Sequence, residues 1–185
     1  MQAFGFLTVL EDSVHGVFGG YLVLSHHGRP LEFRCSTPVK ASRAQEILYG
    51  PALRPYLWGE VVGKQLVSTA EVRAGVVLTD RAEMLALGLC IPEEVLYVAP
   101  AGPEVDVAEA DAPIRLGEKI ESTGRSIYLA PTSLSNVAAQ AASLAPLLAE
   151  VDPLEPFQRI RAALCEVGNL SSDAPEDQHI HAAAA

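Results

Sequence analysis

The chain has 185 residues and a formal net charge of −10, and 49% of its residues are hydrophobic against 19% charged. This composition indicates a globular body of about one domain and excludes a disordered chain. No apolar run approaches the roughly 20 residues of a membrane-spanning helix, and the N-terminus lacks the basic segment of a signal peptide. We therefore expect a cytoplasmic protein with no membrane partner.

The negative charge is concentrated in the second part of the chain. Residues 1–75 hold seven Lys or Arg and six Asp or Glu, whereas residues 76–185 hold six and 17. A protein that neutralises phosphates needs a basic face. The acidic part offers none by composition and the first part offers only a small patch, so the sequence predicts no nucleic-acid partner.

The first predicted elements are two apolar strands, at Ala3–Leu10 and Val17–Ser25. Within the second, Gly19 and Gly20 indicate a bulge or a close approach of another backbone segment. A hairpin turn at residues 26–29 follows, in which Gly28 is free to adopt positive φ.

The next strand alternates apolar and polar residues with a period of two. Leu31, Phe33 and Cys35 alternate with Glu32 and Arg34. This pattern predicts a half-buried antiparallel strand with Phe33 and Cys35 in the core and Arg34 exposed to water.

A capping box, formed by Ser42 and Gln45, predicts the start of a helix with Ile47, Leu48 and Tyr49 on its apolar side. Gly50 and Pro51 end it, and a second helical stretch is expected over Ala52–Ala70.

The second part of the chain alternates short strands with helices. Asp80 ends a buried strand, and with Glu83 it fits the cap of a short helix that ends at Gly88. Asp80 also resembles the carboxylates that phosphotransfer and metal sites place at strand ends in parallel sheets. The remaining predicted elements are strands at Gly75–Thr79 and Val95–Ala99, an acidic loop at Pro100–Pro113, a strand pair at Ile114–Ile120 and Ser126–Ala130, and helices at Leu134–Glu150 and from Asp152 to Gly168.

This order of elements predicts one α/β domain over residues 1–168 and a disordered tail over 169–185. The expected architecture is a two-layer sandwich, with a mainly antiparallel sheet packed by helices and helices at the C-terminus. Residues 17–79 resemble the profilin-like element order of longin, roadblock and GAF/PAS-type domains. The segments GGYLVL, GRPLEF and RAQEILYG resemble an uncharacterised bacterial protein family, which implies no activity.

Common catalytic and cofactor motifs are missing from the sequence. It contains no GxSxG, GxGxxG or GxxxxGK[ST] motif, and its three cysteines, Cys35, Cys90 and Cys165, form no CxxC pair. We therefore predict no catalytic residues, no cofactor, no metal ligands, and free thiols in a reducing compartment.

Polar residues near the predicted turns suggest a metal site as an alternative. Asp12 and His15 lie near one turn, and His26 and His27 in the next. The sequence does not decide whether His15, His26, His27 and Cys35 converge. Adjacent histidines on an extended chain point to opposite faces, so the plainer interpretation is that His26 and His27 are solvated turn residues.

A second group of polar residues lies at the junction between a strand and a helix. The N-terminus of a helix attracts anions, and exposed aromatic side chains can flank such a site. The candidate binding residues are Arg34, Lys40, Arg43, Glu46 and Tyr49.

The predicted function is a non-catalytic interaction module that binds a protein partner or forms a homo-oligomer. Two alternatives remain open: a small-ligand sensor of GAF/PAS type, and a metal-dependent hydrolase that uses Asp12, His15, His26 or His27.

Overall fold

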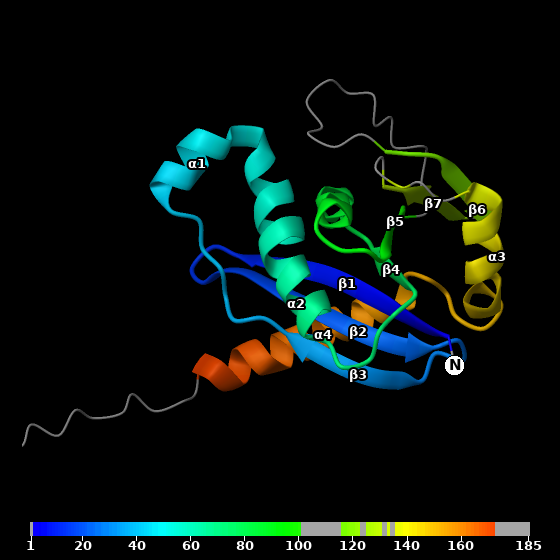
Figure 1. Ribbon diagram of the computed structural model, residues 1–185. Helices are drawn as coiled ribbons and strands as arrows, with labels where there is room; N and C mark the ends of the chain where they lie inside the picture. The colour runs from blue at the N-terminus through cyan, green and yellow to red at the C-terminus, as the bar shows by residue number, and fades with distance from the viewer. Residues whose placement is uncertain (1, 101–115, 123–124, 131–132, 134–135, 173–185) are drawn as a thin grey trace, which may run out of the picture.

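A computed structural model describes residues 2–100, 116–122, 125–130, 133 and 136–172. Within these residues the chain forms a seven-stranded sheet in the order β3-β2-β1-β4-β5-β7-β6 (Figure 1). The strands are β1 (Ala3–Asp12), β2 (Gly16–Ser25), β3 (Pro30–Cys35), β4 (Val76–Thr79), β5 (Glu94–Val98), β6 (Lys119–Ser122) and β7 (Arg125–Leu129). The helical segments are α1 (Arg43–Tyr49), the 3₁₀ turn η1 (Gly50–Ala52), the π-helix η2 (Pro55–Gly63), α2 (Lys64–Thr69), the 3₁₀-helix η3 (Ala82–Leu89), α3 (Val137–Leu148) and α4 (Glu155–Ser172).

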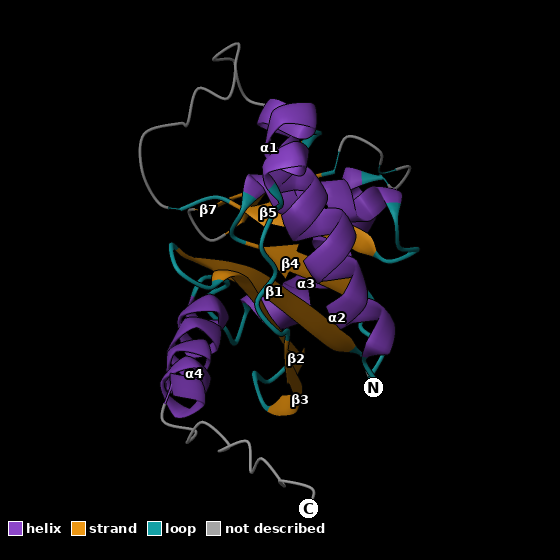
Figure 2. Cartoon of the chain, turned by 90° about the vertical axis from the view of Figure 1, so that its left-hand side faces the viewer, coloured by secondary structure: helices purple, strands orange, loops and turns teal. Residues whose placement is uncertain are grey.

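The sheet is mixed. β1 pairs antiparallel with β2 and parallel with β4, β4 pairs parallel with β5, and the pairs β2–β3, β5–β7 and β6–β7 are antiparallel. The predicted α/β class, the mainly antiparallel sheet and the C-terminal helices are confirmed. Helices cover both faces, as Figure 2 shows for α2 and α4, so the sheet is the middle of three layers and the predicted two-layer arrangement is wrong.

Each face of the sheet has its own apolar core. Leu7, Val9 and Tyr21 pack with η2, α2 and η3 on one face, whereas Phe4 and Phe6 pack with α3 and α4 on the other. Successive strand residues alternate between these faces, and so the central strands are apolar almost throughout.

Gly19 and Gly20 allow helices to approach both faces of β2 at the same point. A Cβ on Gly19 would lie 2.2 Å from Val62 Cγ1, and one on Gly20 would lie 2.3 Å from Ile160 Cγ2. The register between β1 and β2 is continuous through both glycines. The predicted close approach is therefore confirmed, and the alternative of a bulge does not apply.

Strand β3 shows the predicted alternation with its two faces exchanged. Phe33 is 39% exposed, and Cys35 is exposed as well. The side chains of Glu32 and Arg34 are only 13% and 31% exposed. β3 is an edge strand, whereas α4 makes its main strand contacts with β1 and β2. The prediction that Cys35 is buried and Arg34 is solvated is wrong, because the segment after α2 covers the polar side of β3.

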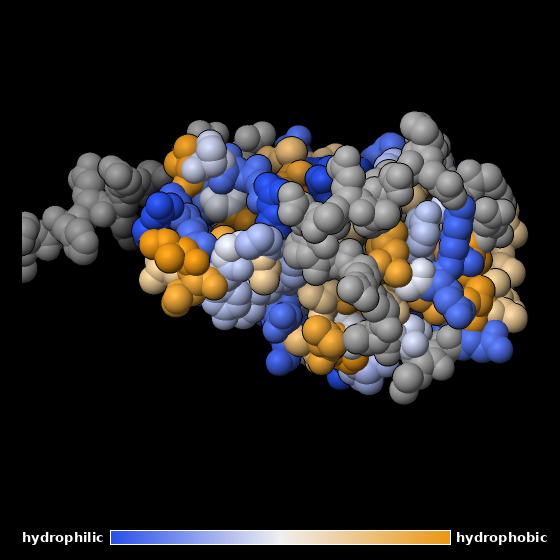
Figure 3. Space-filling view, turned by 90° about the horizontal axis from the view of Figure 1, so that it is seen from above, coloured by the Kyte–Doolittle hydropathy of each residue, from blue (hydrophilic) through white to orange (hydrophobic). Residues whose placement is uncertain are grey.

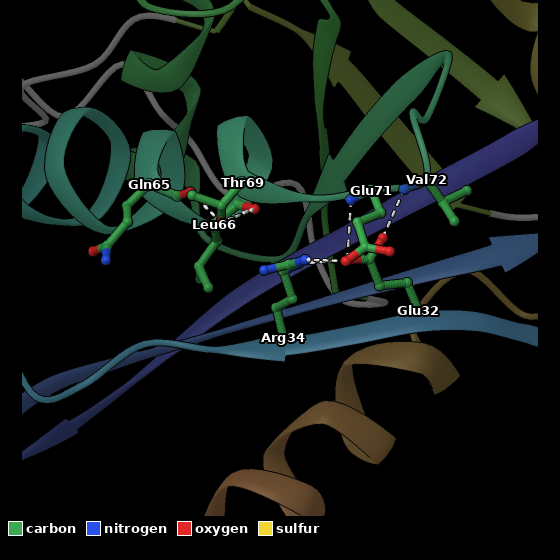
Figure 4. A network of polar contacts seen from close by, with 7 residues as sticks. All are labelled: Glu32, Arg34, Gln65, Leu66, Thr69, Glu71 and Val72. Atoms are coloured by element: carbon green, nitrogen blue, oxygen red, sulfur yellow. Dashed lines mark hydrogen bonds and ion pairs between the residues drawn. The ribbon is translucent and has the colours of Figure 1, made fainter.

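Glu32 ties that segment to the sheet edge (Figure 4). Its carboxylate accepts hydrogen bonds from the backbone N–H of Val72 at 2.7 Å and of Glu71 at 3.1 Å, and it pairs with the Arg34 guanidinium. Burial alone would raise the pKa of Glu32, but these donors outweigh it and hold the pKa below its usual value of 4.5.

Replacing Glu32 with glutamine should lower the free energy of unfolding by about 1 kcal/mol, because the backbone N–H groups of Glu71 and Val72 lose a charged acceptor. A carboxyl whose pKa is lowered on folding stabilises the protein above its unfolded pKa, and this contribution is lost as the pH falls through the folded pKa. The difference between wild type and E32Q, measured by urea unfolding, should therefore be full at pH 7 and shrink as the pH falls below the usual glutamate pKa of 4.5. The exposed Glu118→Gln serves as control, and a pH-independent difference would contradict this assignment.

Several local predictions are confirmed. Ser42 and Gln45 form the capping box of α1, and Gly28 has a φ of 72° in the β2–β3 turn. Ile47 and Leu48 are wrongly predicted as the packed side of the helix: they are 68% and 81% exposed, and α1 contains no buried residue. In Figure 3 the α1 region, at the left, shows apolar surface directly beside hydrophilic surface.

The later elements agree with the sequence where they are described. β6 and β7 pair as predicted, and α4 runs to Ser172, past its predicted end at Gly168. The acidic loop from residue 101 and the tail from residue 173 lie outside the described residues. The domain boundary at residue 168 stays a prediction. Among the described residues, no helix has the length and apolar character needed to cross a membrane.

Candidate functional site at the end of strand β4

The centre of the sheet contains a topological switch point. From β1 the chain runs outward through β2 and β3, then crosses to β4 and β5 on the other side of β1. β1 and β4 are parallel and adjacent, with Leu7 opposite Thr79, the last residue of β4. In open α/β sheets, ligands bind beyond the carboxyl ends of strands at such a point. Asp80, the residue after β4, lies there.

Asp80 is held from two directions. Its Oδ1 accepts a hydrogen bond of 2.6 Å from the hydroxyl of Thr8, a fully buried residue of β1. Its Oδ2 forms a charged hydrogen bond with the guanidinium of Arg161 from α4. The side chain of Asp80 is 12% exposed and that of Arg161 is 32% exposed, so the pair is partly buried and still reachable from solvent.

Arg161 reaches Asp80 because of how α4 lies on the sheet. Phe157, Ile160 and Leu164 form the buried stripe of α4 against β1 and β2, and Phe157 meets Phe6 edge-on with ring centroids 5.5 Å apart. Arg161 follows Ile160 and is therefore rotated by about 100° from the buried stripe. This places its guanidinium beside the helix, over the end of β4.

The predicted role of Asp80 as a helix cap is wrong. The N-cap residue of η3 is Arg81, and no side chain forms a cap hydrogen bond there. The backbone N–H of Arg81 instead donates to the Thr79 hydroxyl at 3.2 Å. The side chain of Asp80 is turned toward Thr8 and Arg161, which are 72 and 81 residues away in sequence.

Further acidic and aromatic groups lie close to this end of the sheet. Burial raises the pKa of the Tyr97 hydroxyl, and the carboxylates of Glu83 and Asp80 raise it further. The ring of Tyr97 stacks on Tyr128 of β7, with centroids 6.1 Å apart. This end of the sheet therefore combines the carboxylates of Asp80 and Glu83, the guanidinium groups of Arg161 and Arg81, and an aromatic pair.

The binding residues predicted from the sequence are not assembled into one pocket. Arg34 pairs with Glu32 and Glu71 under the segment after α2, whereas Arg43 pairs with Glu46 on α1 at 2.8 Å. Lys40 donates to the carbonyl of Val14 at 3.3 Å.

Tyr49 lies in an aromatic pair at the end of α1. Its ring stacks on Tyr56 with centroids 4.4 Å apart, and it is 38% exposed. Hydrogen bonding to Tyr56 and burial raise the pKa of its hydroxyl.

The histidines do not converge. His15 lies in the turn before β2, where its ring and backbone contact the Asp12 carboxylate, and His26 and His27 lie in the turn after β2 with their rings 3.8 Å apart. Because β2 has ten residues, the two turns are separated by about 30 Å. Within the described residues, no group of three or more His, Cys, Asp or Glu is placed to hold a metal ion.

No family model and no curated protein matches the chain. Solved structures do share its fold. The catalytic domain of human Endonuclease V is similar over 94% of this chain and 85% of its own length, with 14% identity and a TM-score of 0.52. A structure of human ENDOV covers 92% of this chain and 86% of its own length, with 17% identity and a TM-score of 0.52. Endonuclease V of Ciona intestinalis, in complex with a 23mer DNA, covers 90% of this chain and 86% of its own at 11% identity; its TM-score of 0.47 is too low to carry an inference.

These likenesses overturn two predictions. The non-catalytic module that binds a protein partner or itself is wrong as a functional assignment, because the fold is shared with Endonuclease V catalytic domains. The exclusion of nucleic acid as a partner is wrong for the same reason. Charge counted over long stretches of the chain misled the prediction, because such counts do not describe the local surface of the folded protein.

Proposed function

We propose that this protein acts on nucleic acid and that the Asp80 group at the switch point is the centre of that function. One observation carries the proposal: a partly buried Thr8–Asp80–Arg161 group lies at the ligand-binding position of a fold that the chain shares, over nearly its whole length, with the catalytic domain of a nuclease. A cytoplasmic location belongs to the same proposal and is supported by three free cysteines, which suit a reducing compartment.

The α1 region supplies groups that suit a nucleic-acid strand. Lys40 and Arg43 are exposed cations, and the stacked pair of Tyr49 and Tyr56 offers an aromatic face. Bases stack on exposed aromatic rings, and cations follow the phosphate backbone. The sequence suggests an anion at Arg34, Lys40 and Arg43; Arg34 is paired with Glu32 and Glu71, and on this proposal the anion at Lys40 and Arg43 is a backbone phosphate.

Binding should be weak and only modestly sensitive to salt, because many of the arginines are paired with carboxylates. Arg43, Arg54 and Arg161 are examples. With about two phosphates neutralised, affinity should fall about tenfold between 50 and 200 mM salt. Fluorescence anisotropy with labelled single-stranded and duplex DNA and RNA measures this, and cleavage of the same oligonucleotides is followed in parallel with and without Mg²⁺ or Mn²⁺.

Neutralising the α1 cations tests where the strand lies. The double variant K40Q/R43Q should weaken binding by about 3–10-fold, since it removes two phosphate-facing charges and leaves Glu46 unpaired. Arg73→Gln is the matched control, because Arg73 is exposed, pairs with Glu93 and lies before the start of β4, at the opposite end from Asp80. Absence of binding to all of these oligonucleotides at 50 mM salt would refute the proposed function.

A further inference from the structure

Each carboxylate oxygen of Asp80 already has a partner within the chain. One carboxylate oxygen accepts the Thr8 hydroxyl and the other pairs with the Arg161 guanidinium. Charged hydrogen bonds of this kind are about twice as strong as neutral ones. A cation that bound Asp80 would have to displace a guanidinium delivered by a helix that is packed along the sheet.

The donor set around Asp80 does not suit a divalent metal ion. Nucleases commonly hold two metal ions, which activate water and stabilise the oxygens of the displaced phosphate. Mg²⁺ prefers near-octahedral oxygen coordination, with at least one or two carboxylates free to bind it. Here the β1 residue beside Asp80 is Thr8, the α4 residue that reaches it is Arg161, and no group of three potential ligands exists among the described residues.

Resting on the function proposed above, we infer that Arg161 takes the place of a divalent cation at the switch point. The guanidinium is the resident counter-ion of Asp80, and nucleic acid meets this centre without a metal bound to that carboxylate. A guanidinium supplies fixed positive charge and directional N–H donors, but it carries no bound water to ionise. The centre is therefore built for recognition through Arg161, which Asp80 and the buried Thr8 hold in place, and not for metal-activated hydrolysis at Asp80.

The test compares Mn²⁺ binding by the full chain and by Asp80→Asn. Free Mn²⁺ is counted by electron paramagnetic resonance at up to about 1 mM metal, a range in which a site with several carboxylates would fill. The two proteins should bind Mn²⁺ equally, since only exposed surface carboxylates contribute. Circular dichroism and the melting temperature verify that D80N is folded, and Glu118→Asn is a control for loss of one surface carboxylate. A Mn²⁺ site that is present in wild type and E118N but missing in D80N would overturn the inference.

A second measurement separates this inference from the proposed function. Oligonucleotide binding should persist within twofold when EDTA replaces Mn²⁺. Binding or cleavage that requires Mn²⁺ and disappears in D80N would overturn the inference while supporting an action on nucleic acid. The protein could also bind no oligonucleotide while wild type and D80N bind Mn²⁺ equally. That result would refute the proposed function but support the inference that Arg161 takes the place of a divalent cation.

Discussion

Replacing Phe157 with alanine should lower the free energy of unfolding by about 3–5 kcal/mol, the range found when a large aromatic side chain is removed from a core. Phe157 is fully buried and contacts Phe6, so the variant leaves a cavity where α4 crosses the sheet. Urea unfolding followed by circular dichroism measures the change.

Phe33→Ala is the matched control for this prediction. Phe33 is 39% exposed on the edge strand, and its removal should cost less than about 1 kcal/mol. Equal losses in the two variants would contradict the packing of α4 on the central strands, and with it the route by which Arg161 reaches Asp80.

Breaking the Asp80–Arg161 pair should give the second largest effect, and the two single variants should differ. Arg161→Gln should lower the free energy of unfolding by about 2 kcal/mol, because it leaves the Asp80 carboxylate, only 12% exposed, without its partner. This loss lies between those typical of exposed and of buried ion pairs. Asp80→Asn should cost about 1 kcal/mol, since the longer Arg161 side chain can turn into water.

A double-mutant cycle isolates the pair from other effects of each change. The variant D80N/R161Q should be about 1 kcal/mol more stable than the sum of the single losses predicts, because neither partner is then left as an unpaired charge. Thermal and urea unfolding provide the four free energies. Strictly additive losses would mean that the two side chains do not interact in solution.

Features encoded within a few residues could be predicted from the sequence. The capping box of Ser42 and Gln45, the turn at Gly28 and the close approach at Gly19 depend on local chemistry and backbone freedom. Helix and strand periodicity gave the α/β class for the same reason.

Features that depend on distant parts of the chain could not be predicted. The alternation in β3 marks two faces, but only its edge position and the reach of α4 decide that Phe33 is exposed and Arg34 is covered. Asp80 looked like a helix cap because its partners, Thr8 and Arg161, are brought to it by a parallel strand pairing and a helix crossing. The strand-end pattern GVVLTD was the one signal in the sequence that pointed to Asp80 as a site.

Oligonucleotide affinity of the two switch-point variants tests the central claim most directly. If a nucleic-acid strand lies against this centre, Asp80→Asn should tighten binding about threefold, because a negative charge near the phosphates is removed and Arg161 is released. Arg161→Gln should weaken it by a similar factor, because Asp80 is left uncompensated. Opposite shifts of this kind, at 50 mM salt and in proteins shown to be folded, are the predicted result. Wild-type affinity in both variants would contradict the placement of the functional centre at Asp80.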